Sequence, residues 1–231
     1  MVSTVKNIKL INGNFAEIHF KDGSVEKRQF PVSALDIKDQ LSESDVKRLL
    51  RTEESDKIQV PLILLPFYFY VIFSNGKVPD QEALLKSYNK FYKKDGKYVQ
   101  EHTDLPDGKF IKERIFRAQP SLVRDFHFYA LCCNSGYFDH VEYDLIRDVR
   151  EDCDVTVELD GKSVDVCLFV RTKASQEWRK KKIAKAEERE RDQVLVSCDL
   201  TSNESTTDKT GGYVLYTDKH LDILKAYFKF S

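Results

Sequence analysis

The sequence has 231 residues, of which 41% are hydrophobic, and it contains 15 Phe and 11 Tyr. This length and composition suffice for one large or two small packed domains and exclude a wholly disordered chain. The 37 basic and 38 acidic residues nearly cancel, so the formal net charge is −1. Overall charge therefore gives no indication of nucleic-acid binding, and any such indication must come from local clusters.

We expect neither a signal peptide nor a membrane-spanning segment. The N-terminus lacks the continuous apolar stretch of a secretory signal. The apolar run 58–73 is shorter than the roughly 20 residues of a membrane-spanning helix and contains Pro61 and Pro66, so it predicts buried strands or a core helix. The five cysteines are odd in number and form no C-x-x-C motif, which indicates reduced thiols in a cytoplasmic protein.

Residues 1–118 are predicted to form a β-meander followed by helices. Three alternating segments are separated by Asn-Gly and Asp-Gly turns, which tolerate the positive φ of tight hairpins. The Asp-Gly pairs at 95–96 and 107–108 predict a hairpin-like stretch that ends near residue 116. The strands are predicted at 5–11, 15–20 and 25–30, and the helices at 33–51 and 79–92.

Residues 119–231 are predicted to form a second domain, of α+β or α/β class, with a mixed central sheet. Pro120 and Ser121 are predicted to open its first helix, because both favour first-turn positions. Three strands, a charged helix and a further strand follow, and one more strand and a helix close the chain. The helices are predicted at 120–133, 175–191 and 218–228, and the strands at 138–146, 153–159, 163–173, 193–200 and 213–216.

Asp154 and Lys173 are the first residues that indicate chemistry. Asp154 begins the second of the three strands and Lys173 ends the third, and the two strands are joined by an Asp-Gly turn at 160–161. Because antiparallel neighbours return to the same end of a sheet, we expect these two side chains to lie close together. The alternative interpretation makes them ordinary charges at strand ends.

The order of elements and this spacing resemble the PD-(D/E)XK nuclease superfamily, which has a restriction-endonuclease-like αβββαβ core. The resemblance covers residues 119–228, under half of the chain, and rests on Asp154 and on the Arg-Thr-Lys tripeptide 171–173. In that family an Asp and a Glu hold Mg²⁺, and a Lys two residues after the Glu orients the attacking water. The resemblance therefore implies a metal-dependent nuclease, a hydrolase in DNA processing or defence, with Asp154 as a metal ligand and Lys173 as a catalytic residue.

One residue departs from the family pattern: Arg171 stands where the family has Glu or Gln. A guanidinium has no lone pair to offer a metal, so either the second ligand lies on another element or the metal site is lost. Asp125 is the first candidate for a displaced metal ligand and catalytic residue, because many family members carry an acidic residue on the preceding helix. Glu142 on the first strand and Asp152 are the other candidates.

The charge of segment 171–192 is a second indication of function, since it has nine basic and five acidic residues. A basic helix beside the catalytic end would bind phosphates in a salt-dependent way, whereas the alternative is a solvated helix face. The predicted nucleic-acid-binding residues are Arg171, Arg179, Lys180, Lys181, Lys182 and Lys185. A second phosphate cluster is predicted at Lys112, Arg114, Arg117 and Arg124.

Three functions stay open on the sequence. The first is a Mg²⁺-dependent nuclease, with DNA ahead of RNA as its substrate. The second is an inactive nuclease-like subunit that binds DNA or serves as a scaffold in a complex. The third is a protein-interaction module that uses the edge of the β-meander and the aromatic run 67–73. A homodimer or a protein partner is expected, and no membrane.

Overall fold

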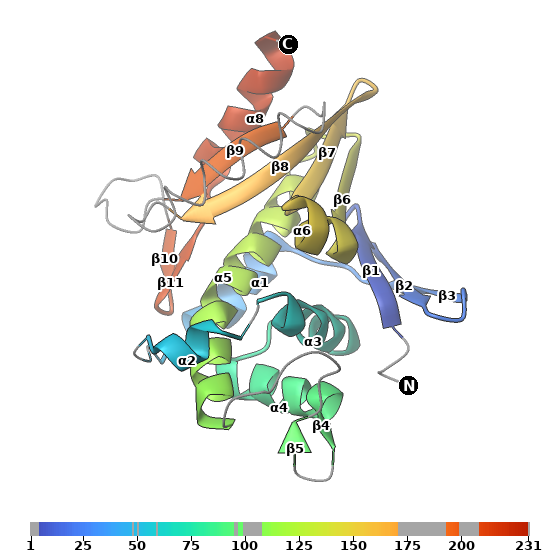
Figure 1. The fold of residues 1–231 in the computed structure, drawn as a ribbon. Coiled ribbons are helices and arrows are strands. Elements are labelled where there is room, and N and C mark those ends of the chain that lie inside the picture. The colour runs from blue at the N-terminus through green and yellow to red at the C-terminus, as the bar shows by residue number, and fades with distance from the viewer. Residues whose placement is uncertain are drawn as a thin grey trace.

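The computed structural model describes residues 5–47, 49, 51–58, 60–94, 97–98, 108–170, 193–198 and 208–230. These residues form a mixed α+β fold in which helices pack against a sheet of seven described strands (Figure 1). The expected class, a mixed central sheet that combines an N-terminal meander with helices, is confirmed.

The N-terminal meander consists of β1 (Val5–Ile11), β2 (Phe15–Phe20) and β3 (Val25–Gln29), which are antiparallel neighbours. Asn12 and Gly13, in the first turn, have φ values of 49° and 65°. These are left-handed values that Asn and Gly adopt at low cost, so the two residues favour the tight turn that joins β1 and β2.

The seven strands lie in the order β3-β2-β1-β6-β7-β8-β9. All neighbours are antiparallel except β8 and β9, which are parallel. The sequence predicts three strands and a further strand in a mixed sheet, and the structure shows that the first three are antiparallel and that the fourth is parallel to the third. The C-terminal strands of this sheet are β6 (His140–Asp144), β7 (Val155–Leu159), β8 (Lys162–Val170) and β9 (Gln193–Cys198).

The remaining described elements are helices and two small hairpins. The helices are α1 (Ala34–Ser42), α2 (Glu53–Asp56), α3 (Pro61–Phe73), α4 (Gln81–Tyr92), α5 (Gly108–Asn134), α6 (Leu145–Glu151) and α8 (Asp218–Phe230). The hairpins pair β4 (Lys93–Lys94) with β5 (Lys97–Tyr98), and β10 (Asp208–Thr210) with β11 (Tyr213–Leu215).

The structure does not divide the described residues at the boundary expected between 118 and 119. That position lies inside α5, and β1 pairs with β6, so the N-terminal meander continues the C-terminal sheet. The buried apolar residues of both parts also form one cluster. The parts share a core because β1 and β6 each place alternate side chains on the same face.

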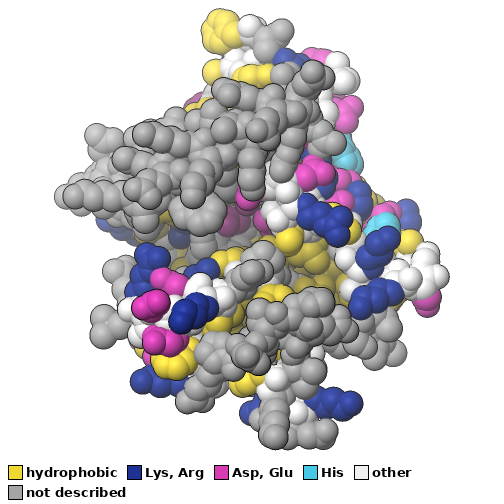
Figure 2. Space-filling view, viewed as in Figure 1, with side chains coloured by type: hydrophobic (Ala, Val, Ile, Leu, Met, Phe, Trp, Pro, Cys, Tyr) yellow, Lys and Arg dark blue, Asp and Glu magenta, His cyan; other side chains and the backbone are white. Residues whose placement is uncertain are grey.

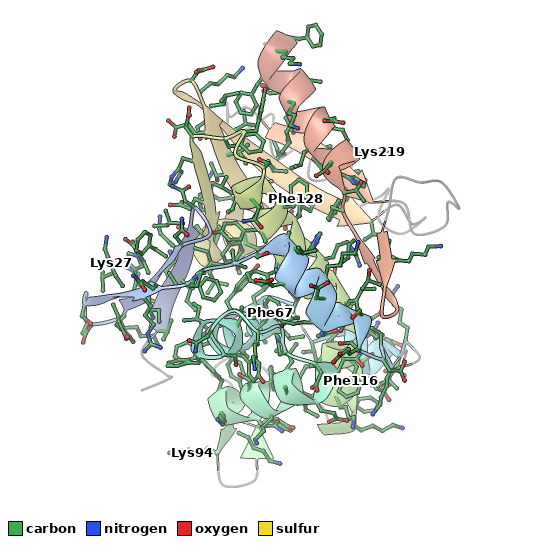
Figure 3. All side chains as sticks on the ribbon, turned by 180° about the vertical axis from the view of Figure 1, so that it is seen from behind. Lys27, Phe67, Lys94, Phe116, Phe128 and Lys219 are labelled. Carbon is green, nitrogen blue, oxygen red and sulfur yellow. The ribbon has the colours of Figure 1, made fainter. Side chains whose placement is uncertain are left out.

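That face of the sheet carries the core. The register places Leu10 opposite Tyr143 and Val141 opposite Val157, and all four side chains are buried. Tyr68 of α3 stacks on Tyr143, with ring centroids 4.0 Å apart. Viewed from behind, the rings of Phe67, Phe116 and Phe128 lie in the interior, whereas Lys27, Lys94 and Lys219 lie at the periphery (Figure 3).

The apolar run is the core helix α3, not a pair of strands. Its buried side chains include Ile63, Phe67 and Val71, four residues apart, so one side of the helix faces the core throughout. Pro61 stands at the first helical position, where its missing N–H is no loss. Among the described residues, no helix is both long and apolar enough to cross a membrane.

Four predicted elements were wrong in extent. The helix predicted at 33–51 is α1, which ends at Ser42, and the hairpin-like stretch predicted to end near residue 116 is replaced by α5 from Gly108 onward. The first helix of the C-terminal region begins at Gly108 rather than at Pro120. Ile111 and Ile115 lie one helical turn apart and are both buried, so they extend the apolar side of the helix toward its N-terminus. The strand predicted to 146 ends at Asp144, whose side chain accepts hydrogen bonds from the N–H groups of Ile146 (2.8 Å) and Arg147 (3.2 Å) and thereby starts α6.

Candidate functional site

Asp154 lies directly before β7 and ties that strand to β8. Its backbone N–H donates to the carbonyl oxygen of Val166 at 2.9 Å. Its carboxylate oxygen Oδ2 accepts a hydrogen bond from the N–H of Leu168 at 2.6 Å. One carboxylate oxygen therefore already has a structural partner in the β-ladder.

The register of β7 and β8 changes the expected relation between Asp154 and the end of the third strand. Val155 pairs with Val166 and Leu159 pairs with Lys162 across the turn. The neighbourhood of Asp154 is thus the middle of β8, and β8 continues beyond it to Val170. β8 is longer than β7, and Lys173 lies outside the described residues, so the expected proximity of Asp154 and Lys173 stays a prediction.

Three carboxylates act electrostatically on the buried hydroxyl of Tyr68. Burial, followed by the negative charges of Asp148, Asp125 and Asp154, raises the pKa of Tyr68 well above its ordinary value. Burial, Tyr68 and Asp148 likewise raise the pKa of Tyr143. Asp125 of α5, Asp148 of α6 and Asp154 before β7 are therefore all within electrostatic range of Tyr68 on α3, and their joint use as a site stays a prediction.

Asp148 is a member of this cluster that sequence reasoning missed. It lies on α6, a helix that was taken for the end of a strand and its loop. The sequence does contain a signal for this helix, since Asp144 can cap residues 145–151 and Asp148 falls one turn later.

Glu142 does not belong to the cluster. It alternates with Tyr143 along β6, so it projects from the opposite face of the sheet. Its carboxylate lies 3.4 Å from Lys9 Nζ, which also lies 3.0 Å from Asp144. Glu142 takes part in a charge network on that face rather than in a site with Asp154.

The opposite face also carries a network around Arg147 of α6. The guanidinium group donates from Nη2 to both carboxylate oxygens of Asp165 at 2.6 Å, and from Nε to Glu151 at 3.0 Å. Its Nη1 donates to the hydroxyl of Thr156. Burial raises the pKa of neighbouring Cys153 to about 12, so this thiol stays protonated at neutral pH.

The second predicted phosphate cluster does not form an open basic patch. Lys112 pairs with Glu82 at 2.8 Å, Arg114 donates to the carbonyl oxygen of Ile58, and Arg117 pairs with Asp56 at 2.9 Å. Arg124 is buried. Over the face shown in Figure 2, basic and acidic side chains of the described residues are interspersed.

The remaining predicted site residues lie outside the described residues. They are Lys173, the predicted catalytic residue, and the six predicted nucleic-acid contacts Arg171, Arg179, Lys180, Lys181, Lys182 and Lys185.

The carboxylates that the structure describes can be compared with the requirements of a magnesium site. Within the described ranges, no three His, Cys, Asp or Glu side chains are arranged so that they could hold a metal ion. Asp154 additionally commits one oxygen to the N–H of Leu168. Mg²⁺ requires oxygen ligands in nearly octahedral geometry, so the second oxygen of Asp154 is the one left to meet that requirement.

Comparison with known proteins adds no family to this picture. No family model matches the chain, and neither a curated protein nor a solved structure matches it. The argument for function therefore depends on the residues and the fold.

Proposed function

We propose that this protein binds nucleic acid, with DNA ahead of RNA, through a restriction-endonuclease-like core that lacks a metal-dependent cleavage site. The observation that carries the proposal is the order of α5, the antiparallel strands β6, β7 and β8, and the parallel strand β9. This is the order that the resemblance to the PD-(D/E)XK superfamily implies.

The sequence supplies the charge for such binding directly after this framework. β8 ends at Val170, and the next 22 residues contain nine basic and five acidic side chains. Contacts from Lys and Arg to phosphates release counterions, which gives an affinity that falls steeply with salt. We include a cytoplasmic location and a homodimer or protein partner in the proposal, and the odd number of five cysteines without a C-x-x-C motif supports the location.

The absence of cleavage is proposed from two observations. Arg171 cannot ligate a metal, and within the described ranges no three His, Cys, Asp or Glu side chains are arranged to hold one. The second candidate function, a Mg²⁺-dependent nuclease, is favoured by a different observation, namely the convergence of Asp125, Asp148 and Asp154 near Tyr68. The first two candidates differ in whether phosphodiester bonds break.

The third candidate, a protein-interaction module, finds less support. Most of the aromatic run proposed as its binding surface is core, since Phe67 and Tyr68 are buried. The surface that remains available for a protein partner consists of the edge strand β3 and the exposed rings of Phe15 and Phe73.

The test is a binding titration with fluorescent single-stranded and double-stranded DNA and RNA at 50 and 200 mM salt. A variant with Ala at Lys180, Lys181, Lys182 and Lys185 is compared with a variant with Ala at the exposed residues Lys21, Lys77, Lys86 and Lys90. Both variants lose four positive charges. We expect the first to bind at least about tenfold more weakly and the second to stay within about twofold of the wild type.

Cleavage is measured in the same samples with Mg²⁺, Mn²⁺ or chelator. Asp154→Asn keeps an oxygen that accepts the hydrogen bond from Leu168, and Glu158→Gln on the same strand is its control. Cleavage that Asp154→Asn abolishes and Glu158→Gln preserves would replace the proposal with the nuclease. Equal loss of binding in both lysine variants, or no binding by the wild type, would contradict the proposed nucleic-acid binding.

A further inference from the structure

A cavity of about 490 Å³ lies beside the C-terminal sheet, away from the carboxylates near Tyr68. Its walls are the segment between α1 and α2, one side of α5, the end of β8 at Val170, and the β10–β11 hairpin. This volume is within the range of cavities that hold small-molecule ligands.

Three basic side chains line the cavity, and no Asp or Glu is among its described lining residues. These are Lys47, Arg117 and Arg124. Arg117 shares its charge with Asp56, at 2.9 Å, whereas Lys47 is mostly exposed and lies 4.0 Å from Glu82. The described part of the cavity wall therefore has a positive charge of about two, which matches the charge of a phosphate monoester at neutral pH.

Arg124 provides the strongest indication that the cavity binds an anion. Only 6% of it is exposed, and its Nε donates to the carbonyl oxygen of Val214 at 2.9 Å. Its Nη1 is buried without a hydrogen-bond partner, and it forms no ion pair with any described carboxylate. Arg117 Nε is also buried without a partner among the described residues.

A buried guanidinium stays charged, and it is costly to bury without a counter-charge. Structural arginines in proteins are paired for this reason. A bound anion would offset the charge of Arg124, whose side chain lines the cavity. Ser121 and Lys47 line the same cavity, and their hydroxyl and ammonium groups are of the kind that donates hydrogen bonds to the oxygens of an anion.

The rest of the cavity wall is apolar. Val46, Leu49, Phe116 and Val214 line it, and they can cover a part of the ligand that carries no charge. Inorganic phosphate would leave that part of the cavity unfilled. The size and the division into a basic and an apolar side fit a small organic molecule with one phosphate group.

We propose that this cavity binds a small phosphate monoester of mononucleotide size, with its phosphate group against Arg124, Lys47 and Ser121. This proposal is independent of the nucleic-acid binding proposed above, because none of these residues belongs to segment 171–192.

The experiment is isothermal titration calorimetry of the full chain with adenosine 5′-monophosphate, inorganic phosphate, adenosine and acetate. Adenosine monophosphate should bind, inorganic phosphate should compete with it, and adenosine and acetate should bind at least about tenfold more weakly. Equal binding of adenosine, or equal competition by acetate, would overturn the assignment to a phosphate monoester.

Arg124→Met removes the guanidinium and keeps a long apolar side chain, and Arg28→Met removes an arginine from the β3 edge as the control. The Arg124 variant should lose at least about tenfold in affinity, and the control should stay within about twofold. Lys47→Gln provides a second test at a largely exposed side chain, where misfolding is not expected, and should lose about threefold or more. Wild-type affinity in both cavity variants, or no binding of adenosine monophosphate to the folded wild type, would overturn the proposal.

Discussion

Arg147 and Arg124 are two arginines of the same protein in opposite situations. Arg147, on α6, binds both carboxylate oxygens of Asp165 and also contacts Glu151 and Thr156. Arg124, on α5, is more deeply buried, yet among the described residues its hydrogen bond is to the carbonyl oxygen of Val214.

The difference shows why a basic residue cannot be assigned a role from its charge alone. Arg147 connects the start of α6 to β7 and β8, and its charge is used within the protein. The charge of Arg124 is not neutralised by any described residue, which is the condition for recognising an external anion. Four experiments, ordered from the largest expected effect to the smallest, test this contrast.

Removing the partner of Arg147 should have the largest effect on stability. Asp165→Ala leaves a partly buried guanidinium without its bidentate carboxylate, so we expect a loss of about 3 kcal/mol in the free energy of unfolding. Urea denaturation measures this loss. Glu158→Ala on the adjacent strand should change it by less than about 0.5 kcal/mol. Equal stability of the two variants would show that the ion pair between Arg147 and Asp165 does not stabilise the fold.

The β10–β11 hairpin, which forms one wall of the cavity beside Arg124, lies against α1 at Gly211. Gly211 has φ of +54°, and a Cβ added there would overlap the carbonyl oxygen of Leu41. Gly161 has φ of +76° but open space around the added Cβ. We expect Gly211→Ala to cost about 2 kcal/mol more than Gly161→Ala, as thermal unfolding can show. Equal costs would mean that the hairpin does not press against α1.

The network near Arg147 should also respond to acid through Asp144. Burial favours the neutral acid, but hydrogen bonds from Lys9, the Arg147 N–H and Asn7 stabilise the carboxylate more strongly, so the pKa of Asp144 is below its usual 3.8. Because the folded-state pKa is lowered, this stabilisation is present above about pH 4 and is lost as the pH falls through the folded value.

Asp144→Asn should therefore cost about 1.5 kcal/mol at pH 7, and the gap to the wild type should narrow below pH 4. Denaturation between pH 7 and pH 2.5 measures the gap. Asp222→Asn, at an exposed position on α8, is the control and should show a small gap throughout. A gap that is as large at pH 2.5 as at pH 7 contradicts the assignment.

The smallest effect is expected at Arg124. Arg124→Met removes a buried charge that has no ion-pair partner, and the loss of one hydrogen bond to Val214 is offset by that gain. The free energy of unfolding should change by less than about 1 kcal/mol, whereas Arg147→Met should cost more than about 2 kcal/mol. Equal costs measured by urea denaturation would remove the contrast between the two arginines.

Local signals in the sequence predicted much of the secondary structure. Asn-Gly and Asp-Gly pairs placed the turns of the first meander and of the β7–β8 hairpin, because few residues adopt positive φ at low cost. Helix α4 followed from helical spacing, although it begins at Gln81, after its cap Asp80, rather than at Pro79. The start of α5 and the existence of α6 were missed, because Pro120 and a short apolar segment gave misleading local signals.

The candidate site was predicted only in part. The sequence pointed to Asp125 and Asp154, and both lie near Tyr68. It gave no reason to exclude Glu142, because which face of a sheet a strand residue occupies depends on pairing with other strands. The roles of Arg124 and Arg147 could not be distinguished either, because the carboxylate that binds Arg147 from another strand, Asp165, is 18 residues away in the sequence.

The sequence by itself determined the turns, the alternating strands and the amphipathic helices, because these depend on backbone preferences and side-chain spacing within a few residues. Only the tertiary structure decided that β1 joins β6 in one sheet, that Asp148, Asp125 and Asp154 all act on buried Tyr68, and that Arg147 has a carboxylate partner whereas Arg124 has none among the described residues. These outcomes depend on which residues distant in the chain become neighbours, and burial then sets the energetic value of each charge.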